Sequence, residues 1–493
     1  MNGRVSKNKG EKDMVDVAVI GCGVIGAAVA YSLSQYQLKV AVLEQHADVA
    51  VGTTKANSAI IHAGYDPAPG TLMARLNVEG NRLAGEIAEK LSVPFRRVGS
   101  LVLALSEDDL ERIQALYQRG VANGVPGIRL LSREETLARE PRLSEQVRGS
   151  LWAPSAGIID PWEYATAMAE MAVVNGVDLQ LQTRVTGIEP TDFGFAIRTS
   201  RGTVEAQYLV CAAGVEAAAV RGMAEAPDYV IQPSRGEYFL LDHSEGETVH
   251  SVIFQCPNEL GKGVLVAPTV HGNLIVGPNA ASTDDPDNCQ VTASGLAYIE
   301  SAARRSVPGL NLAANIRNFA GIRANSDRDE FRIERSETYP HLIDLAGMKS
   351  PGLSAAPAVA RYAVQLLEQA GLALKKKASF CDRREKFRFN ELSDAERAAL
   401  IAREPAYGRV ICRCQTVTEG DILAALHRPI PPRSINAVKR RVGAGMGRCQ
   451  GGFCSPRVHE LIARELGIDP LEVCLEDPGS ELLTGETKMG GMA

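Results

Sequence analysis

The chain has 493 residues, more than one ordinary hydrophobic core contains, so we expect two or three domains. Apolar residues make up 45% and charged residues 23% of the sequence, which excludes a largely disordered or fibrous chain. The formal net charge of −6 provides no basic field for phosphate backbones, so we expect no nucleic-acid partner.

The first residues show neither a targeting signal nor a membrane span. Residues 1–13 are polar and charged and lack the apolar core of a secretory signal, so we expect a cytoplasmic protein. Residues 17–38 are uncharged and long enough to cross a bilayer. They divide, however, into an apolar run, a glycine turn and an alanine-rich stretch, which is typical of a strand, a loop and a helix.

Apolar strands alternate with helical stretches along most of the chain, which predicts an α/β fold. The strand-like segments are 15–20, 39–44, 100–105, 207–214, 236–242, 263–269 and 272–277. A charged, apolar-poor stretch then predicts a linker over 376–407, followed by a compact cysteine-bearing unit at 408–472. The tail from residue 476 has the composition of a mobile segment.

A glycine-rich turn follows the first strand and precedes an apolar helix. Gly21, Gly23 and Gly26, with Val24 and Ile25 between them, form GCGVIG, the fingerprint of a dinucleotide site. The helix N-terminus would face a pyrophosphate, and Glu44 would accept hydrogen bonds from a ribose. The fingerprint alone does not separate NAD from FAD.

Segments spread over about 360 positions resemble the D-amino-acid-oxidase-like superfamily of FAD enzymes. They are 52–64, 157–170, 208–217, 233–241, 265–280 and 350–367. The resemblance implies a Rossmann-like FAD domain that is discontinuous, with an inserted α+β substrate domain. We expect the FAD domain at 15–90, 151–230 and 323–375, and the substrate domain at 91–150 and 231–322.

The same resemblance implies which further residues contact FAD. The loop at 52–58 is rich in small polar donors, and a helix opening at 352 would stabilise negative charge on a reduced flavin. The expected FAD contacts are Thr53, Thr54, Asn57, Ser58, Val185, Ala213, Gly214, Gly321, Gly352, Leu353 and Ser354.

Four side chains are candidates for the substrate site. His62 lies in a segment that such enzymes place beside the flavin, and three readings stay open: a base, a covalent flavin anchor or a packed histidine. Arg323 matches an arginine that these enzymes use for an anionic group of the substrate, and a guanidinium fork suits a carboxylate or a phosphate. Tyr238 and Lys349 are further candidates.

Four of the ten cysteines form two tight pairs, Cys412 with Cys414 and Cys449 with Cys454. Four thiolates fit an iron–sulfur cluster or a structural zinc, and zinc sites usually show CxxC pairs or histidines instead. The pattern resembles the bacterioferritin-associated-ferredoxin-like 2Fe-2S domain, including GMGRCQGGFC. We expect a small helical domain whose nearby basic residues temper the negative charge of the cluster: Lys439, Arg440, Arg441 and Arg448.

The order of the two modules resembles the catalytic subunit of anaerobic glycerol-3-phosphate dehydrogenases. That resemblance implies a small anionic substrate, an oligomer and a partner subunit that accepts electrons and provides any peripheral membrane association. Tyr65 and Asp66 stand where such enzymes have an arginine for phosphate, and residues 57–81 look closer to L-2-hydroxyglutarate dehydrogenases and oxidases. Similar fusions oxidise amino or imino acids such as hydroxyproline, and a non-catalytic electron-transfer or docking flavoprotein is the alternative from another class.

Overall fold

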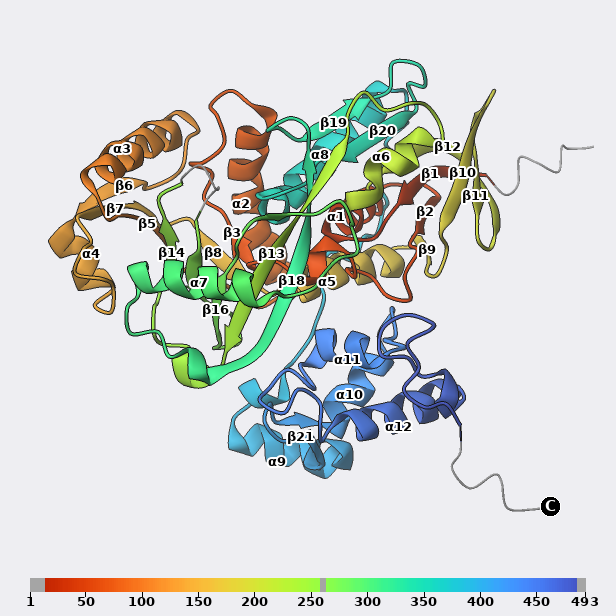
Figure 1. Cartoon of the computed structure of the whole chain (residues 1–493). Helices are drawn as coiled ribbons and strands as arrows, with labels where there is room; N and C mark the ends of the chain where they lie inside the picture. Colours follow the sequence, from red (N-terminus) through yellow and green to blue (C-terminus); the bar gives the residue numbers. More distant parts are fainter. Residues whose placement is uncertain (1–13, 258–262, 486–493) are drawn as a thin grey trace, which may run out of the picture.

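The computed structural model describes residues 14–257 and 263–485, which form two large sheets and a C-terminal helical unit (Figure 1). The α/β expectation is confirmed. Within these ranges no helix is both long and apolar enough to cross a membrane.

The first sheet is built around β1 (Val15–Ile20), an apolar strand that pairs in parallel with neighbours on both sides. Helices α1 (Val24–Leu33), α5 (Pro161–Val174) and α8 (Gly352–Gln369) pack in one shared core with it. Near-continuous apolar runs are typical of strands covered on both faces. The other strands are β2 (Val40–Leu43), β9 (Asp178–Gln180), β10 (Val185–Thr191), β11 (Gly194–Thr199), β12 (Gly202–Cys211), β19 (Arg332–Arg335) and β20 (Leu342–Ala346).

The second sheet is mainly antiparallel, and its longest pair joins β13 (Ile231–Leu241) to β18 (Asn315–Ser326). Two of its strands run across the expected domain boundaries: β7 (Gly149–Ala153) crosses 150/151 and β18 crosses 322/323. The remaining strands are β5 (Ser100–Ala104), β6 (Arg129–Ser132), β14 (Val252–Gln255), β15 (Leu265–Pro268), β16 (Leu274–Gly277) and β17 (Ala281–Ser282).

Further helices and a small sheet complete the first 375 residues. The small sheet contains β3 (Ile60–Ile61), β4 (Phe95–Arg96) and β8 (Gly157–Ile159). The helices are α2 (Leu72–Lys90), α3 (Glu107–Ala122), α4 (Arg133–Arg139), α6 (Ala217–Gly222) and α7 (Ala293–Ser306).

The C-terminal unit has its own apolar core and lies below the sheets in Figure 1. Its elements are α9 (Asp394–Arg403), β21 (Val410–Cys412), β22 (Val417–Thr418), α10 (Glu419–Leu426), α11 (Ile435–Val442) and α12 (Ser455–Leu466). Helices α11 and α12 end at Gly443 and Gly467, whose positive φ angles of 77° and 61° suit glycine.

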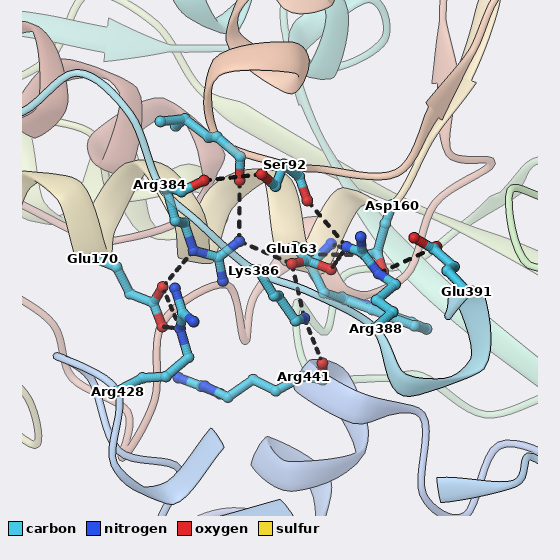
Figure 2. Close-up of polar contacts among 12 residues, drawn as sticks. Ser92, Asp160, Glu163, Glu170, Arg384, Lys386, Arg388, Glu391, Arg428 and Arg441 are labelled. Atoms are coloured by element: carbon cyan, nitrogen blue, oxygen red, sulfur yellow. Dashed lines mark hydrogen bonds and ion pairs between the residues drawn. The ribbon is translucent and has the colours of Figure 1, made fainter. Parts of the chain in front are cut away.

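The segment expected to be a simple linker is instead folded and anchored. It contains α9, and Arg384, Lys386 and Arg388 bind the buried Glu163 at the start of α5 (Figure 2). The tail is also anchored, since Asp477 binds His46 and residues 476–481 are bonded to one another and to Cys474, so the expectation of a mobile tail is wrong for these residues. The C-terminal third is therefore attached both to α5 and to the loop that follows β2.

Candidate functional site

The glycine turn after β1 has the geometry that a dinucleotide site requires. Gly21 has φ +93°, and a Cβ there would lie 2.6 Å from the carbonyl oxygen of Ala212. A Cβ on Gly26 would lie 1.9 Å from the oxygen of Gly21, so this glycine lets α1 pack closely on the turn. The Val24 N–H donates to Thr54 Oγ1 at 3.0 Å, which links the turn to the loop at 52–58.

A cavity of about 990 Å³ is lined by this turn and by residues of both large sheets. Of the expected FAD contacts, all but Gly26 and Ser354 line it: Gly21, Gly23, Val24, Ile25, Glu44, Thr53, Thr54, Asn57, Ser58, Val185, Ala213, Gly214, Gly321, Gly352 and Leu353. A Cβ on Gly321 would lie 1.9 Å from the oxygen of Ala56, so the wall of the cavity there requires glycine. The size and the lining both fit FAD.

Glu44 is buried at the end of the cavity near the glycine turn. Its Oε2 accepts from the Cys22 N–H at 2.7 Å and its Oε1 from the His46 N–H at 2.9 Å. Burial raises the pKa of this carboxyl, and the two backbone donors oppose that effect. The carboxylate is thus held in place for a ribose to approach.

His62 also lines the cavity, and its main chain is fixed by three side chains. Its N–H donates to Ser354 Oγ at 2.7 Å, and its carbonyl accepts from Asn77 at 2.8 Å and Asn81 at 2.9 Å. Ser350 Oγ lies 3.1 Å from His62 Nε2. Ser354 therefore contributes by orienting His62 rather than by lining the cavity.

The other predicted substrate-site residues all line the same cavity. Arg323 on β18 donates to the oxygen of Asn279 at 3.0 Å, and Lys349 pairs with Asp329. The Tyr238 hydroxyl lies 3.1 Å from Ser58 Oγ, which attaches β13 to the loop at 52–58.

A further arginine at this cavity was not predicted from the sequence. Arg119 of α3 lines the cavity and donates to the backbone oxygen of Asp66 at 2.6 Å. Asp66 is one of the two residues at the position where the resemblance implies an arginine. Its place on an ordinary amphipathic helix gives no local motif by which to find it.

Four cysteines border a second, smaller cavity of about 210 Å³ together with Arg413, Arg448 and Phe453. Cys412 Sγ and Cys414 Sγ are 3.8 Å apart, and Cys449 and Cys454 complete the set. Among the described residues, no three cysteine, histidine or acidic side chains gather around a point that could hold one metal ion.

The backbone around these thiols fits a group bound through thiolates. A Cβ on Gly447 would lie 2.5 Å from Cys414 Sγ, so glycine is required there. The N–H groups of Phe453 and Gly451 lower the pKa of Cys449. The described residues that border this cavity include no histidine and no acidic residue, so the four thiols are its only candidate metal ligands among them.

Three of the four basic residues that were expected to temper the charge of the cluster also bind acidic residues of the first 375 residues. Arg448 lines the cysteine cavity but also binds Asp242 through two bonds of 2.7 Å. Arg440 and Arg441 bind the buried Asp48. They therefore join the C-terminal unit to the rest of the chain.

Comparison with known proteins identifies the class. Residues 16–366 match the family of FAD dependent oxidoreductases, and the chain belongs to this family. Residues 410–464 match the BFD-like [2Fe-2S] binding domain, and all four cysteines lie within the matched range. The predictions of FAD, a 2Fe-2S cluster and an oxidoreductase are thereby confirmed.

Three similar proteins narrow the comparison. A glycerol 3-phosphate dehydrogenase of Caloramator mitchellensis is 48% identical over 476 residues, covering 96% of this chain and 99% of the relative. The dithionite-reduced L-alpha-glycerophosphate oxidase of Mycoplasma pneumoniae, with FAD bound, superposes with a TM-score of 0.72 at 34% identity, covering 76% of this chain and 100% of that one. An L-2-hydroxyglutarate dehydrogenase of Escherichia coli O17:K52:H18 is 32% identical over 54% of this chain and 64% of its own.

Proposed function

We propose that this protein is a glycerol-3-phosphate dehydrogenase that passes electrons from FAD to its own 2Fe-2S cluster and then to a partner. The observation that carries the proposal is that His62, Arg119, Arg323 and Lys349 all line the FAD cavity. Three cations suit a phosphate-bearing substrate. The relative with 48% identity spans both modules and has this activity in its name.

The reaction removes two electrons and two protons from the secondary alcohol. The residues that line the cavity would hold FAD, which would supply the hydride acceptor for C2 of the substrate. His62 Nε2 accepts the hydroxyl proton as the C2–O bond becomes a carbonyl, which gives dihydroxyacetone phosphate. The bonds from Ser354, Asn77 and Asn81 to the His62 main chain keep the imidazole directed into the cavity.

Recognition of the substrate phosphate is the part of the proposal that the chain's own residues must explain. Tyr65 and Asp66 stand where the resemblance implies an arginine for the phosphate. Arg119 of α3 donates a hydrogen bond to the Asp66 carbonyl, so its guanidinium lies at this position. We assign Arg119 to the phosphate together with Arg323. The second candidate is L-2-hydroxyglutarate, which the similarity to that dehydrogenase favours and whose two carboxylates would also suit these arginines.

The electrons would leave through the exposed edge of the cluster site. A 2Fe-2S cluster takes one electron at a time, which favours a dehydrogenase over an oxidase. Cys414 is exposed and the Phe453 side chain is 76% exposed at the rim of the cysteine cavity. An exposed aromatic ring at a redox centre is suited to contact a one-electron partner protein.

We also propose that the protein is cytoplasmic and oligomeric. All ten cysteines lie in the described ranges and none of them forms a disulfide there, which agrees with a reducing, cytoplasmic location. We infer an oligomer that meets its acceptor subunit in that compartment.

The test is anaerobic reduction of the bound flavin by glycerol-3-phosphate, L-2-hydroxyglutarate and proline-type amino acids, read by absorbance. We expect bleaching by glycerol-3-phosphate first, followed by the EPR signal of a reduced cluster. Arg119→Gln should raise KM for glycerol-3-phosphate about tenfold or more and change the spectrum of bound FAD little. Faster bleaching by L-2-hydroxyglutarate would contradict the assignment of glycerol-3-phosphate as the substrate. Rapid peroxide formation without cluster reduction would show that the enzyme is an oxidase and not a dehydrogenase.

A further inference from the structure

The loop that follows β2 serves two parts of the molecule. Its ends line the FAD cavity, through residues 44–46 on one side and 51–55 on the other. Its middle, residues 47–50, does not line the cavity and instead contacts the C-terminal unit. One short loop therefore joins the cofactor site to the iron–sulfur domain.

Asp48 anchors the middle of this loop. Its carboxylate accepts hydrogen bonds from Arg440 at 2.9 Å and from Arg441 at 2.7 and 2.8 Å, and both arginines lie on α11. The Asp48 side chain is only 4% exposed. Burial alone would raise the pKa of Asp48, but Arg441 and Arg440 outweigh it and lower this pKa to about 2. The charge is therefore paired, as a buried carboxylate requires.

Asp477, in the tail, anchors the same loop at the two residues that precede Asp48. Its Oδ2 lies 2.8 Å from His46 Nδ1, and its Oδ1 accepts from the Ala47 N–H at 2.8 Å. The loop is also bonded to the glycine turn, because the Ala50 N–H donates to the oxygen of Cys22 at 3.0 Å. A displacement of the loop would thus reach both Glu44 and the turn that receives the pyrophosphate.

We propose that the iron–sulfur domain is a structural part of the FAD site, and that Arg441, Arg440 and Asp477 are positioning residues for FAD. They act through the loop at 44–55 and do not touch the cofactor themselves. Binding of FAD and docking of the iron–sulfur domain are then coupled, and linkage requires the coupling to act in both directions. The inference depends on the FAD site alone and holds whichever substrate the enzyme oxidises.

The experiment compares full-length variants from which FAD has been removed and to which it is returned. Arg441→Gln removes the bidentate partner of Asp48 while Arg440 stays, and Asp477→Asn keeps the shape of the second anchor. The matched control is Arg428→Gln, which breaks a pair of 2.9 Å with the buried Glu170 of α5 at the same interface but away from the loop. FAD affinity is measured by quenching of flavin fluorescence, and the docking of α11 by hydrogen exchange with and without FAD.

The coupling predicts a rise in the Kd for FAD of about tenfold in Arg441→Gln and about threefold in Asp477→Asn, with less than a twofold change in the control. FAD should slow hydrogen exchange in residues 435–442 of the wild type and do so less in Arg441→Gln. If Arg441→Gln fails to fold, Asp477→Asn and the wild-type exchange experiment carry the test. Unchanged FAD affinity in the folded loop variants, or exchange in 435–442 that FAD does not alter, would show that the two modules are only tethered.

Discussion

Glu163 offers the sharpest test of how the C-terminal third is held. Its carboxylate lies in the first turn of α5 with 5% of its side chain exposed, and binds Arg384, Lys386 and Arg388 at 2.8 Å each (Figure 2). Glu163→Gln keeps the volume of the side chain and removes its charge. Three cations then lose their shared counter-ion, although Arg384 retains Glu170.

The expected loss follows from the pKa of Glu163. Burial raises this pKa, but Lys386, Arg388 and Arg384 outweigh burial and lower it from 4.5 to about 2. A difference of this size corresponds to about 3 kcal/mol of free energy that favours the folded, charged state. Because the folded pKa is the lower one, this stabilisation is present above pH 4.5 and is lost as the pH falls toward 2.

Native-state hydrogen exchange of residues 380–392 measures the effect where it arises. A loss of about 3 kcal/mol should raise the open population of this segment about 100-fold at neutral pH. The control is Glu86→Gln, which removes an exposed pair with Arg82 on α2 and should cost at most about 0.5 kcal/mol. Lowering the pH from 5 to 3 should weaken protection in the wild type and much less in Glu163→Gln.

An exchange rate in Glu163→Gln within threefold of that in Glu86→Gln would refute this reasoning. It would mean that the desolvation of four charged groups cancels their attraction, as happens for some buried ion pairs. The C-terminal third would then be held by its apolar contacts.

Three further predictions address the redox centres. Gly21→Ala should yield protein with little bound flavin by absorbance, because its Cβ would lie 2.6 Å from the Ala212 oxygen at a φ of +93°; normal flavin content would contradict the assigned turn. His62→Gln should retain FAD and lower kcat about 100-fold or more in the substrate assay, whereas a near-normal kcat would exclude His62 as the base. Cys449→Ser should remove the reduced-cluster EPR signal and leave anaerobic flavin reduction intact, and a retained signal would exclude this cysteine as a ligand.

The parts of the site that could be predicted from the sequence are those whose residues lie close together in the chain. GCGVIG predicted the turn because strand, glycines and helix are contiguous, and the spacing of Cys412, Cys414, Cys449 and Cys454 predicted the thiol set. His62 was found through a segment resemblance, which gave its location but left its role open.

The missed residues are joined only by the tertiary structure. Asp48 and Arg441 are 393 positions apart: Asp48 alone reads as an ordinary surface charge, and Arg441 was predicted only as a positive neighbour of the cluster. Arg119 belongs to a helix whose amphipathic pattern is explained by packing alone, and only the fold brings it to Asp66. The segment expected to be a simple linker differs from that expectation for a related reason. Its basic residues bind buried carboxylates of α5, which are far away in the sequence.

The long pair β13–β18 contacts both the FAD cavity and the cluster domain. Arg323, which lines the cavity, stands opposite Ser234 in the register of this pair, and Arg317, nearer the start of β18, donates to Gln450 beside Cys449 at 2.9 Å. Asp242, directly after β13, binds Arg448 on the other side of that cysteine. Both strands therefore contact the cluster domain at the same edge of the sheet, β13 just after its last residue and β18 near its first. We predict that variants at Asp242 change the rate of cluster reduction without changing the rate of flavin reduction.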